Sequence, residues 1–384
     1  MPEVLIDITR LLNRSLQGRL PTGVDRVSLA YIKYFFDRAQ ALLRIDQQSV
    51  VLNQSASKRI FEQLLFPANH LHTKIIKLLV TACFNIQYSP DLKNKFFLNI
   101  GHSGLEKKAY LQQLKKNGVK PLFLIHDLIP ITHPEYCREG EMDKHIRRIN
   151  NVLNFASGII TNSQNTLNHL QDYAGETGKI VPTTVVAHLG LSDFIQPSTI
   201  RPIAQPYFVV LGTIEPRKNH YLLLHIWRKL IAELRTQAPR LLIIGQRGWE
   251  CENVIDLLER CPSLQAHVTE LASCSDLELV TYLKHAQALL FPSFVEGYGI
   301  PLIEALALGT PVIASHLAVF HEIAGSIPDY IDPLDSIGWI KQIKAYSADN
   351  NEFRQAQLNL MENFVQPTWA AHFQRVEELM ERVR

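Results

Sequence analysis

The sequence predicts an α/β protein built from two doubly wound parallel sheets, and three observations support this fold class. Short β-branched runs alternate with longer amphipathic segments along nearly the whole chain, as expected for parallel sheets covered by helices on both faces. The length of 384 residues exceeds that of one typical domain. Residues 188–206 contain three prolines and no periodicity, and this segment predicts a linker between two similar halves.

Five short strands are predicted in the first half from runs of aliphatic, aromatic and β-branched residues. They cover residues 4–8, 96–99, 121–125, 158–161 and 184–187. Apolar residues at helical spacing predict helices over residues 24–36 and 105–114. Residues 59–84 combine apolar and basic side chains, which favours a core helix with solvated lysines over an amphipathic helix at an anionic membrane surface.

The second half repeats this alternation after the linker. Its predicted strands cover residues 207–211, 240–244, 267–271, 288–291 and 311–314, and a final amphipathic helix covers residues 368–384. We therefore expect an N-terminal domain at residues 1–195 and a C-terminal domain at residues 205–365. Ligands of open α/β sheets bind beyond the carboxyl ends of the strands, so we expect these ends to face each other across a deep cleft.

Charge, hydropathy and cysteine content exclude several classes of protein. Lys and Arg number 39 against 37 Asp and Glu, and this net charge of +2 is too balanced for a nucleic-acid binder. The longest apolar stretch, residues 305–321, contains a Gly-Thr-Pro sequence that would break a membrane-spanning helix. Glu3 and Asp7 stand where a secretory signal needs basic and apolar residues, so we expect a cytoplasmic protein. Five cysteines without a CxxC pair indicate neither a disulfide framework nor a zinc site.

Several common nucleotide-binding and catalytic motifs are absent. Residues 18–23 have the outer glycines of a P-loop, but Val24 and Asp25 replace its Lys and its Ser or Thr. Residues 297–302 lack the third glycine of a dinucleotide fingerprint, and residues 101–105 are one glycine short of a nucleophile elbow. Without a DxD pair there is no obvious carboxylate site for a divalent metal on a diphosphate. Protein cations and backbone amides must therefore neutralise any bound diphosphate.

The first candidate site is the segment Gly212-Thr-Ile-Glu-Pro-Arg-Lys-Asn219. It follows a predicted strand and opens a helix, where unpaired amides and the positive end of the helix dipole receive anions. Arg217 supplies a planar fork of donors and Lys218 a mobile point charge, which together suit the dispersed oxygens of a diphosphate. The alternative is a capped helix with solvated basic residues, although a basic pair at a helix start opposes the dipole.

The second candidate site runs from Phe291 to Ala305, where a buried strand leads into a glycine-flanked loop and a helix. Pro301 fits the first turn of that helix, where its missing amide costs nothing. Glu304 lies about one turn further, and its carboxylate can accept bonds from a vicinal diol such as ribose. Glu296 stands in the loop, so the two carboxylates can address two ends of one ligand. For Glu304 alone, a favourable first-turn acid is the alternative.

These two segments resemble the motifs of a known enzyme family. Glu296 and Glu304 have the spacing of the E-x7-E motif of retaining GT-B glycosyltransferases. The sequence GTIEPRKN resembles the diphosphate motif of the same group, glycosyltransferase family 4, and the spacing between the two motifs is also similar. The resemblance implies a GT-B fold with two Rossmann-like domains.

The resemblance covers nearly the whole chain. The strand ends at His126-Asp127 and Asn162-Ser163 are similar to the acceptor-side positions of the family. The helix that contains Trp369 resembles the family's crossing C-terminal helix. We therefore expect residues 366–384 to cross back to the N-terminal domain.

Carried over by position, the resemblance implies roles for single residues of this sequence. Arg217 and Lys218 would bind the diphosphate of a nucleotide sugar, and Glu304 would hold its ribose. Glu296 would bond the sugar hydroxyls. His126 would touch the donor sugar near the reacting carbon, and a core or capping histidine is the alternative.

The other implied donor contacts come from loops and helix starts. Arg247 would lie beside the nucleobase, although a surface loop explains it nearly as well, and Gly23 would bring the amides of the first helix to the cleft. The other residues implied to contact the donor lie in the two motifs. They are Gly212 and Thr213 of the diphosphate motif, and Gly297, Tyr298 and Gly299 of the glycine loop. No metal site is implied.

Two residues depart from the family's pattern. Thr213 stands where many relatives have an arginine, so one cation at the phosphate is missing and Arg217 is expected to compensate. Thr22 precedes Gly23, where relatives often carry paired glycines, and this changes how closely an acceptor or phosphate approaches that turn.

The expected function is a retaining, metal-independent hexose transfer without a cofactor. We expect mannose from GDP-mannose as the donor, and a lipid-linked or oligosaccharide acceptor in bacterial surface polysaccharide assembly. We also expect peripheral contact with the cytoplasmic face of the inner membrane. The alternatives are a sugar-nucleotide epimerase or a phosphorylase of similar fold, and an inactive sugar-nucleotide-binding scaffold subunit.

Overall fold

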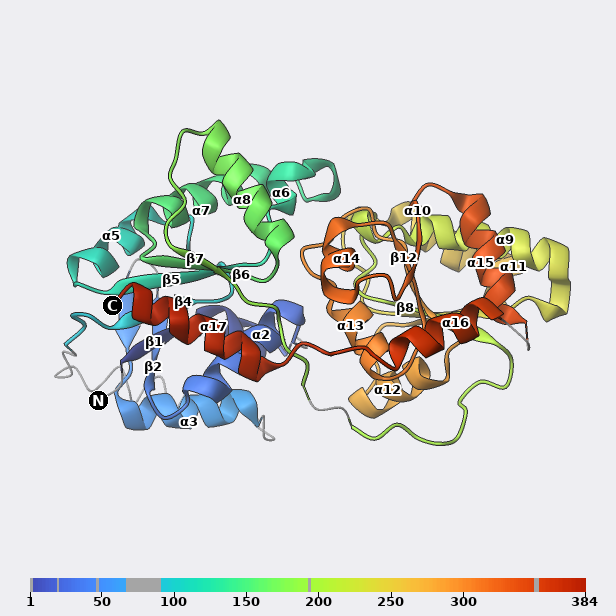
Figure 1. Cartoon of the computed structure of the whole chain (residues 1–384), viewed down its shortest axis with the longest axis horizontal. Coiled ribbons are helices and arrows are strands. Elements are labelled where there is room, and N and C mark those ends of the chain that lie inside the picture. Colours follow the sequence, from blue (N-terminus) through green and yellow to red (C-terminus); the bar gives the residue numbers. More distant parts are fainter. Residues whose placement is uncertain (1–2, 19–20, 46–47, 67–90, 193–194, 349–351) are drawn as a thin grey trace. The chain divides into compact units, whose positions relative to one another are not determined.

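The computed structural model describes residues 3–18, 21–45, 48–66, 91–192, 195–348 and 352–384. Contacts between residues divide the chain into two compact units. The first unit comprises Met1–Ile131, Met142–Leu189 and Thr368–Arg384, and the second comprises Thr132–Glu141 and Gly190–Pro367. Figure 1 labels many of the helices and strands of the two units.

The described part of the first unit is built on a seven-stranded sheet with the order β3-β2-β1-β4-β5-β6-β7. All neighbouring strands are parallel except β2 and β3, which pair antiparallel. The strands are β1 (Val4–Asp7), β2 (Ala39–Ile45), β3 (Gln48–Val51), β4 (Phe96–Asn99), β5 (Lys120–Ile125), β6 (Gly158–Thr161) and β7 (Thr184–Val186). The five predicted strands correspond to β1 and β4 to β7, whereas β2 and β3 were not predicted.

Polar residues explain why β2 was not predicted from the sequence. Gln40 is fully buried in this strand because its amide donates to the carbonyl of Leu52 at 2.9 Å and its carbonyl accepts from Lys95 at 2.8 Å. The side chain of Arg44, near the end of the strand, is 8% exposed, and its Nε lies 3.2 Å from Oδ2 of Asp7. Polar groups that are paired in this way can be buried without a large loss of stability, and hydropathy does not reveal the pairing.

Helices flank the sheet of the first unit (Figure 1). The helices of the first half are α1 (Thr9–Leu16), α2 (Gly23–Phe35), α3 (Gln54–Leu65), α5 (Lys108–Lys116), α6 (Ile129–Thr132), α7 (Glu141–Phe155) and α8 (Gln164–Glu176). The predicted segment 59–84 overlaps α3, whose Ile60 and Phe61 are buried in the core. Its remainder, with Lys74, Lys77 and Cys83, lies outside the described residues. The preference for a core helix over a membrane-surface helix therefore stays a prediction.

The final helix, α17 (Trp369–Arg382), belongs to the first unit, as the sequence predicts. Its Phe373 ring stacks on Tyr34 of α2 with centroids 3.9 Å apart. His372 of α17 is also buried, and its Nε2 lies 2.8 Å from the hydroxyl of Tyr31. These contacts fix α17 against α2, at the opposite end of the sequence. None of the helices in the described ranges is long and apolar enough to cross a membrane.

The second unit contains a six-stranded sheet with the order β10-β9-β8-β11-β12-β13, in which every described pair is parallel. Its strands are β8 (Tyr207–Leu211), β9 (Arg240–Ile244), β10 (Val268–Leu271), β11 (Leu289–Phe291), β12 (Val312–Ser315) and β13 (Asp329–Ile331). The first five match the predicted strands to within one residue, and the short, half-buried β13 was not predicted.

Helices separate the strands of the second unit. They are α9 (His220–Leu234), α10 (Glu252–Arg260), α11 (Pro262–Gln265), α12 (Asp276–His285), α13 (Ile300–Ala307), α14 (Ala318–Ala324), α15 (Ser336–Ser347) and α16 (Glu352–Met361), with single 3-10 turns at η1 (Pro134–Tyr136), η2 (Pro216–Lys218) and η3 (Arg235–Gln237). The fold class predicted from the sequence, two Rossmann-like α/β units, is confirmed.

The sheet order of the second unit positions the candidate site. The chain passes outward from β8 to β9 and β10, and then returns to the other side of β8 as β11. The loops that follow β8 and β11 therefore diverge from neighbouring strands at a topological switch point, where ligands of open α/β sheets bind.

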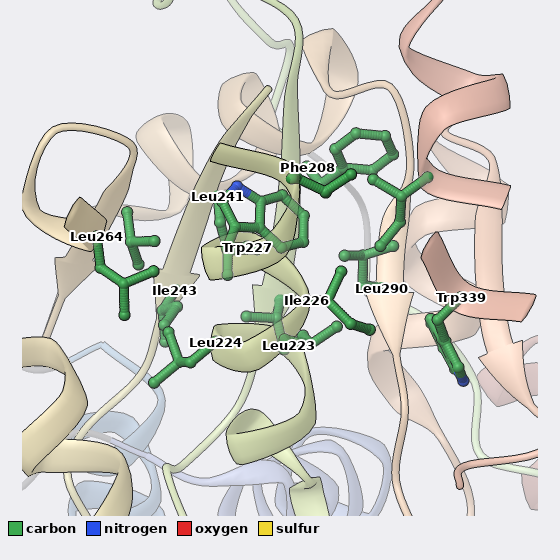
Figure 2. Close-up of a cluster of buried hydrophobic side chains, with 14 of the residues drawn as sticks. Phe208, Leu223, Leu224, Ile226, Trp227, Leu241, Ile243, Leu264, Leu290 and Trp339 are labelled. Carbon is green, nitrogen blue, oxygen red and sulfur yellow. The ribbon is translucent and has the colours of Figure 1, made fainter. Parts of the chain in front are cut away.

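The core beneath this switch point is centred on Trp227 of α9 (Figure 2). Its indole is fully buried against Phe208 of β8, with ring centroids 5.9 Å apart, and its Nε1 donates to the carbonyl of Pro239 at 2.8 Å. The cluster continues through aliphatic residues of β9 and β11 to Trp339 of α15. Helix α9, which begins directly after the first candidate motif, is thus held to the sheet over its length.

Replacing Trp227 by alanine is expected to lower the free energy of unfolding of the second unit by about 3–5 kcal/mol, because it leaves a large cavity and an unpaired carbonyl. Urea unfolding followed by circular dichroism measures the change. As a control, Ile337→Ala removes a side chain that is 74% exposed in the same unit, and should change stability by less than about 1 kcal/mol. Equal stabilities of the two variants would contradict this description of the core.

Candidate active site

The loop after β8 carries the first predicted motif. Gly212 has a φ of +136°, a backbone conformation that side chains rarely adopt, and the turn it makes leads to the 3-10 helix η2, which contains Arg217 and Lys218. Asn219 follows with a φ of +57° and is the N-cap of α9. The two cations thus lie in a separate turn before α9, rather than in its first turn as the sequence predicted.

Asn219 fixes this loop to two others. Its Nδ2 donates to the carbonyl of Pro292 at 3.2 Å and to the carbonyl of Pro333 at 2.9 Å. Pro292 follows β11, and Pro333 follows β13. One buried amide therefore connects the ends of three strands around the cations.

The two predicted motifs meet at Glu296, which lies 78 residues after Lys218 in the sequence. The Nζ of Lys218 lies 2.5 Å from Oε1 of Glu296, and the Nη1 of Arg217 lies 2.5 Å from Oε2. Ser293 donates its hydroxyl to Oε1 at 2.7 Å. The sequence predicted that these side chains serve one site, and the structure brings them into direct contact.

A fourth charged group, Glu215, completes this cluster. Its Oε1 lies 2.6 Å from the Nε of Arg217, so the guanidinium is held at one edge by Glu215 and at another by Glu296. Both glutamates and Lys218 are buried, and Arg217 is partly buried. We call Glu215, Arg217, Lys218 and Glu296 the charge cluster; it contains two cations and two carboxylates.

Burial and pairing act in opposite directions on the charge cluster. Burial alone would raise the pKa of Glu296, but the two neighbouring cations and the hydrogen bonds from Lys218 and Ser293 lower it to about 2. Burial lowers the pKa of Lys218, and Glu296 opposes this effect. Burial raises the pKa of Glu215 despite its two cationic neighbours. Each charge is thus expensive to bury alone, and the cluster is stable because the charges compensate one another.

The low pKa of Glu296 predicts a pH dependence of stability. The carboxyl titrates near 4.5 in the unfolded chain and near 2 in the folded protein, so the ionised form stabilises the fold. This contribution is complete above about pH 4.5 and is lost as the pH falls toward 2. We therefore expect the free energy of unfolding to fall more steeply between pH 6 and pH 3 in the wild type than in Glu296→Gln. If urea unfolding gave the same change of the free energy of unfolding with pH in the wild type and in Glu296→Gln, this expectation would be contradicted.

The loop after Glu296 leads into α13 as the sequence predicts. Gly299 is the N-cap of α13 with a φ of +121°, and a Cβ there would lie 2.9 Å from the ring of Phe320. Gly297 precedes it, and Tyr298 between the two glycines is buried. Glu304 is half-buried one turn into α13. Glu304, the residue predicted to bind the ribose, therefore lies on the helix that starts beside the charge cluster.

Arg247 lies on the neighbouring loop after β9. This loop is closely packed against the first motif, because a Cβ at Gly245 would lie 2.0 Å from the carbonyl oxygen of Gly212, and Ile214 pairs with Arg247 as an isolated bridge. The guanidinium of Arg247 makes two contacts of 2.8 Å with Glu270 and one of 2.6 Å with Glu259. Arg247 thus lies next to the first motif with its charge paired to two carboxylates, and its predicted contact with a nucleobase stays a prediction.

Two predicted residues, His126 and Gly23, belong to the first unit. His126 follows β5 and is buried, and its Nε2 donates to the carbonyl of Ile100 at 2.7 Å. Burial lowers its pKa, so the ring is neutral at pH 7. Asn162 donates its Nδ2 to the carbonyl of His126 at 2.9 Å. Gly23 is the first residue of α2, as the sequence predicts.

The start of α2 is occupied by side chains of the first unit. Asp25 is buried and accepts the amide of Thr22 at 2.7 Å, and it pairs with Arg10 at 3.0 Å and Arg14 at 2.8 Å. Thr22, which replaces a glycine of the family's pattern, is the N-cap of this helix. The threonine thus takes part in a capping box.

Sequence reasoning missed Glu215, Ser293 and Asn219 as site residues. Glu215 is part of the first motif, but its burial and its contact with Arg217 follow only from the packed loops. Ser293 stands three residues before Glu296, and its signal in the sequence was a polar residue two positions after a buried strand. The αL conformation of Asn219 follows a pattern common for asparagine, and it is a signal that could have been used.

Two family models match separate parts of the chain. Residues 193–328 match the model described as glycosyl transferases group 1. Residues 103–184 match the model described as glucosyltransferase 3-like, N-terminal domain. The first match contains the whole charge cluster together with Arg247 and Glu304.

Curated relatives from enteric bacteria include several mannosyltransferases. The chain is 31% identical to the serotype-specific mannosyltransferase WbdA of Escherichia coli over 227 residues, 55% of this chain and 28% of the relative. It is 30% identical to the O-antigen chain mannosyltransferase B of Escherichia coli over 222 residues, 55% of this chain and 56% of the relative. The chain thus spans about a quarter to a half of the length of these relatives.

Solved structures similar to the whole chain include two with low sequence identity. The Anabaena protein HepE, in complex with UDP and glucose, has a TM-score of 0.70 at 16% identity and covers 100% of both chains. The sucrose-phosphate synthase of Thermosynechococcus elongatus has a TM-score of 0.62 at 15% identity, with coverage of 99% and 98%. These likenesses show the fold. The chain therefore has the GT-B fold, its residues 193–328 are similar to glycosyl transferases group 1, and mannosyltransferases are among its relatives.

Proposed function

We propose that the chain is a retaining, metal-independent glycosyltransferase that moves mannose from GDP-mannose to a lipid-linked or oligosaccharide acceptor in bacterial surface polysaccharide assembly. The names of the relatives support the sugar and the pathway: they include a serotype-specific mannosyltransferase and two O-antigen chain mannosyltransferases. Because the chain covers only part of these proteins, donor and acceptor are proposed on their likeness.

The charge cluster is the observation that carries this proposal. Sugar transfer from a nucleotide sugar develops negative charge on the leaving diphosphate, and preorganised cations in a water-poor site stabilise that charge. Lys218 and Arg217 are held in such a site at the switch point of the sheet. Two protein cations can supply the charge that a divalent metal supplies in other transferases, which supports a metal-independent reaction.

The other donor contacts follow from the positions of the predicted residues. Glu304 on α13 would hold the ribose, and the amides of residues 297–299 would face the phosphates. Arg247 on the adjoining loop would lie beside the nucleobase, and Glu296 would bond the sugar hydroxyls. The turn at Gly212 brings its backbone close to the aliphatic stem of Lys218, since a Cβ there would lie 3.4 Å from Cε of Lys218.

We assign no protein base to the reaction. In the proposed retaining mechanism, an oxygen of the leaving phosphate takes the proton of the acceptor hydroxyl on the face that the phosphate leaves. His126 of the first unit would orient the donor sugar near the reacting carbon. Its neutral, hydrogen-bonded ring suits an orienting contact better than proton transfer, because Nε2 already donates to a carbonyl.

A glucosyl donor is the second candidate. Residues 103–184 match the glucosyltransferase 3-like model, and HepE was solved in complexes with UDP, glucose and UDP-glucose. Thermal shift with GDP-mannose and UDP-glucose separates the two donors, because a ligand that binds only the folded protein raises its melting temperature. Incubation of the donor without acceptor also tests for an epimerase, which would release a changed sugar nucleotide.

Transfer in excess EDTA, with the product examined by NMR, tests the mechanism. We expect full activity after chelation and the same anomeric configuration in donor and product, since the protein's own cations bind the diphosphate and the sugar is displaced with retention. An inverted linkage or a strict requirement for metal would end the proposed mechanism. Binding of nucleotide sugars without turnover on a panel of acceptors would favour a scaffold subunit.

A further inference from the structure

In this structure the carboxylate of Glu296 is already engaged by the cations that the donor would need. Its Oε1 accepts from Lys218 and from Ser293, and its Oε2 accepts from Arg217. A carboxylate oxygen accepts about two hydrogen bonds, so the capacity of Oε1 is used. The proposed function instead requires Glu296 to bond sugar hydroxyls and requires Lys218 and Arg217 to bond phosphate oxygens.

We propose that the diphosphate of the donor displaces the Glu296 carboxylate from Lys218 and Arg217, and that the released carboxylate then takes the hydroxyls of the sugar. This inference rests on the proposed function, because it describes how the same site changes partners when a nucleotide sugar binds. While no donor is bound, the Glu296 carboxylate occupies the two cations that the diphosphate would bind.

The burial of the cluster explains why the cations need a counter-charge before the donor binds. Lys218 is 8% exposed, and an ammonium group held this far from water is costly without a counter-charge. Glu296 supplies that charge in the structure. A diphosphate carries more negative charge and more acceptor oxygens than one carboxylate, so it can replace Glu296 at both cations.

Glu215 keeps the site in place during this exchange. It holds Arg217 through Nε, whereas Glu296 is bound to Nη1 of the same guanidinium. The planar fork of arginine can therefore change its partner at one nitrogen while another stays anchored. Glu215 is thus a positioning residue, and Glu296 is the group that moves.

The exchange gives the site a preference for the intact donor over the bare nucleotide. A nucleotide sugar replaces the bonds that Glu296 loses, because its hydroxyls are offered to the released carboxylate. A nucleoside diphosphate without sugar displaces Glu296 and leaves that buried carboxylate without its two cationic partners, which costs affinity. The product nucleotide is therefore bound more weakly than the donor, and its release is favoured.

Calorimetric titration of Glu296→Gln with GDP, UDP and inorganic diphosphate in excess EDTA tests the exchange. Without the Glu296 charge, the ligand no longer has to break a charge-assisted contact that stabilises the unliganded protein. The sugar-free ligands should therefore bind at least about tenfold more tightly. GDP-mannose and UDP-glucose should gain less, because the variant also loses a bond to the sugar. A simple loss of a ligand-binding residue would change affinity in the opposite direction.

Two further variants make the result independent of the folding of Glu296→Gln. Glu233→Gln removes a carboxylate near the other end of α9, about 20 Å along the helix, and should leave all affinities unchanged. Ser293→Ala removes one hydrogen bond that holds Glu296 on Lys218, and should tighten the binding of inorganic diphosphate by a few-fold. Thermal melts of each variant are recorded with and without diphosphate.

The outcomes separate the exchange from the proposed function. Tighter binding of sugar-free diphosphates to Glu296→Gln and Ser293→Ala supports the exchange. Equal or weaker binding in these variants, with clear binding to the wild type, overturns the exchange and leaves the proposed function standing. If none of the diphosphates binds the folded wild type or any variant, the diphosphate site itself is wrong, and both proposals fail.

Discussion

Lys218→Ala is expected to lower kcat/KM for sugar transfer by roughly 100- to 1,000-fold, the usual loss for one preorganised electrostatic contact. The Nζ of Lys218 is buried in the charge cluster, 2.5 Å from Oε1 of Glu296 and 4.8 Å from the ring centroid of Phe291. Steady-state transfer rates with the identified donor measure the effect. The loss should appear in kcat as well as in KM, because charge on the diphosphate develops in the transition state.

Lys344→Ala is the matched control for this prediction. Lys344 lies on α15 of the same unit, where it pairs with Glu233 at the surface and is 40% exposed. An exposed pair of this kind contributes little, so the variant should keep the wild-type rate to within about twofold. A similar rate for Lys218→Ala and Lys344→Ala would show that the charge cluster does not bind the leaving group.

Glu296→Ala is expected to lower kcat by roughly 10- to 1,000-fold, because the sugar loses the carboxylate that orients it. In the same variant, GDP or UDP should bind more tightly than in the wild type, since Glu296 no longer competes for Lys218 and Arg217. Initial rates and calorimetric titration of the same preparation measure the two effects. Truncation of an ordinary structural residue would weaken both catalysis and binding.

The opposite signs make this prediction sensitive to the role of Glu296. Wild-type transfer by Glu296→Ala would show that the sugar does not depend on this carboxylate. A loss of transfer together with weaker binding of nucleotide would instead show that Glu296 only supports the local fold. Circular dichroism spectra of the variant and the wild type establish that both proteins are folded under the assay conditions.

The sequence was most informative where burial and residue type agree. The strands at residues 207–211 and 240–244 were predicted with their observed bounds, because both are almost entirely apolar and buried inside a parallel sheet. β2 and β13 were missed for the opposite reason. Within β2, Gln40 is buried and the side chain of Arg44 is 8% exposed, both through specific partners, whereas β13 is short and half-buried.

In the candidate site, too, residue types predicted some features, whereas others depend on long-range packing. Two motifs predicted Arg217, Lys218 and Glu296 as partners of one ligand, but their mutual contact depends on β8 and β11 being neighbours in the sheet. That adjacency follows from topology and cannot be read from either motif alone. Glu215 was missed because a carboxylate inside a basic motif is usually solvated, and only the structure shows it buried against Arg217.

Arg247 illustrates a limit of reasoning by position. The loop after β9 lies beside the diphosphate motif in the structure, since Gly245 and Gly248 allow its backbone to approach Gly212 and Ile214 closely. The two carboxylates that pair with Arg247 come from α10 and β10. Their placement depends on long-range packing, so the sequence did not predict that the charge of Arg247 is paired, and its contact with a nucleobase stays a prediction.

A crystal structure of the wild-type protein with GDP, grown in the presence of EDTA, tests the central claim most directly. The account predicts phosphate oxygens within hydrogen-bond distance of Nζ of Lys218 and Nη1 of Arg217, with Arg217 still bound to Glu215 and Glu296 displaced from both cations. A diphosphate bound elsewhere in the protein, or one that leaves the contacts of Glu296 with Lys218 and Arg217 intact, would contradict it.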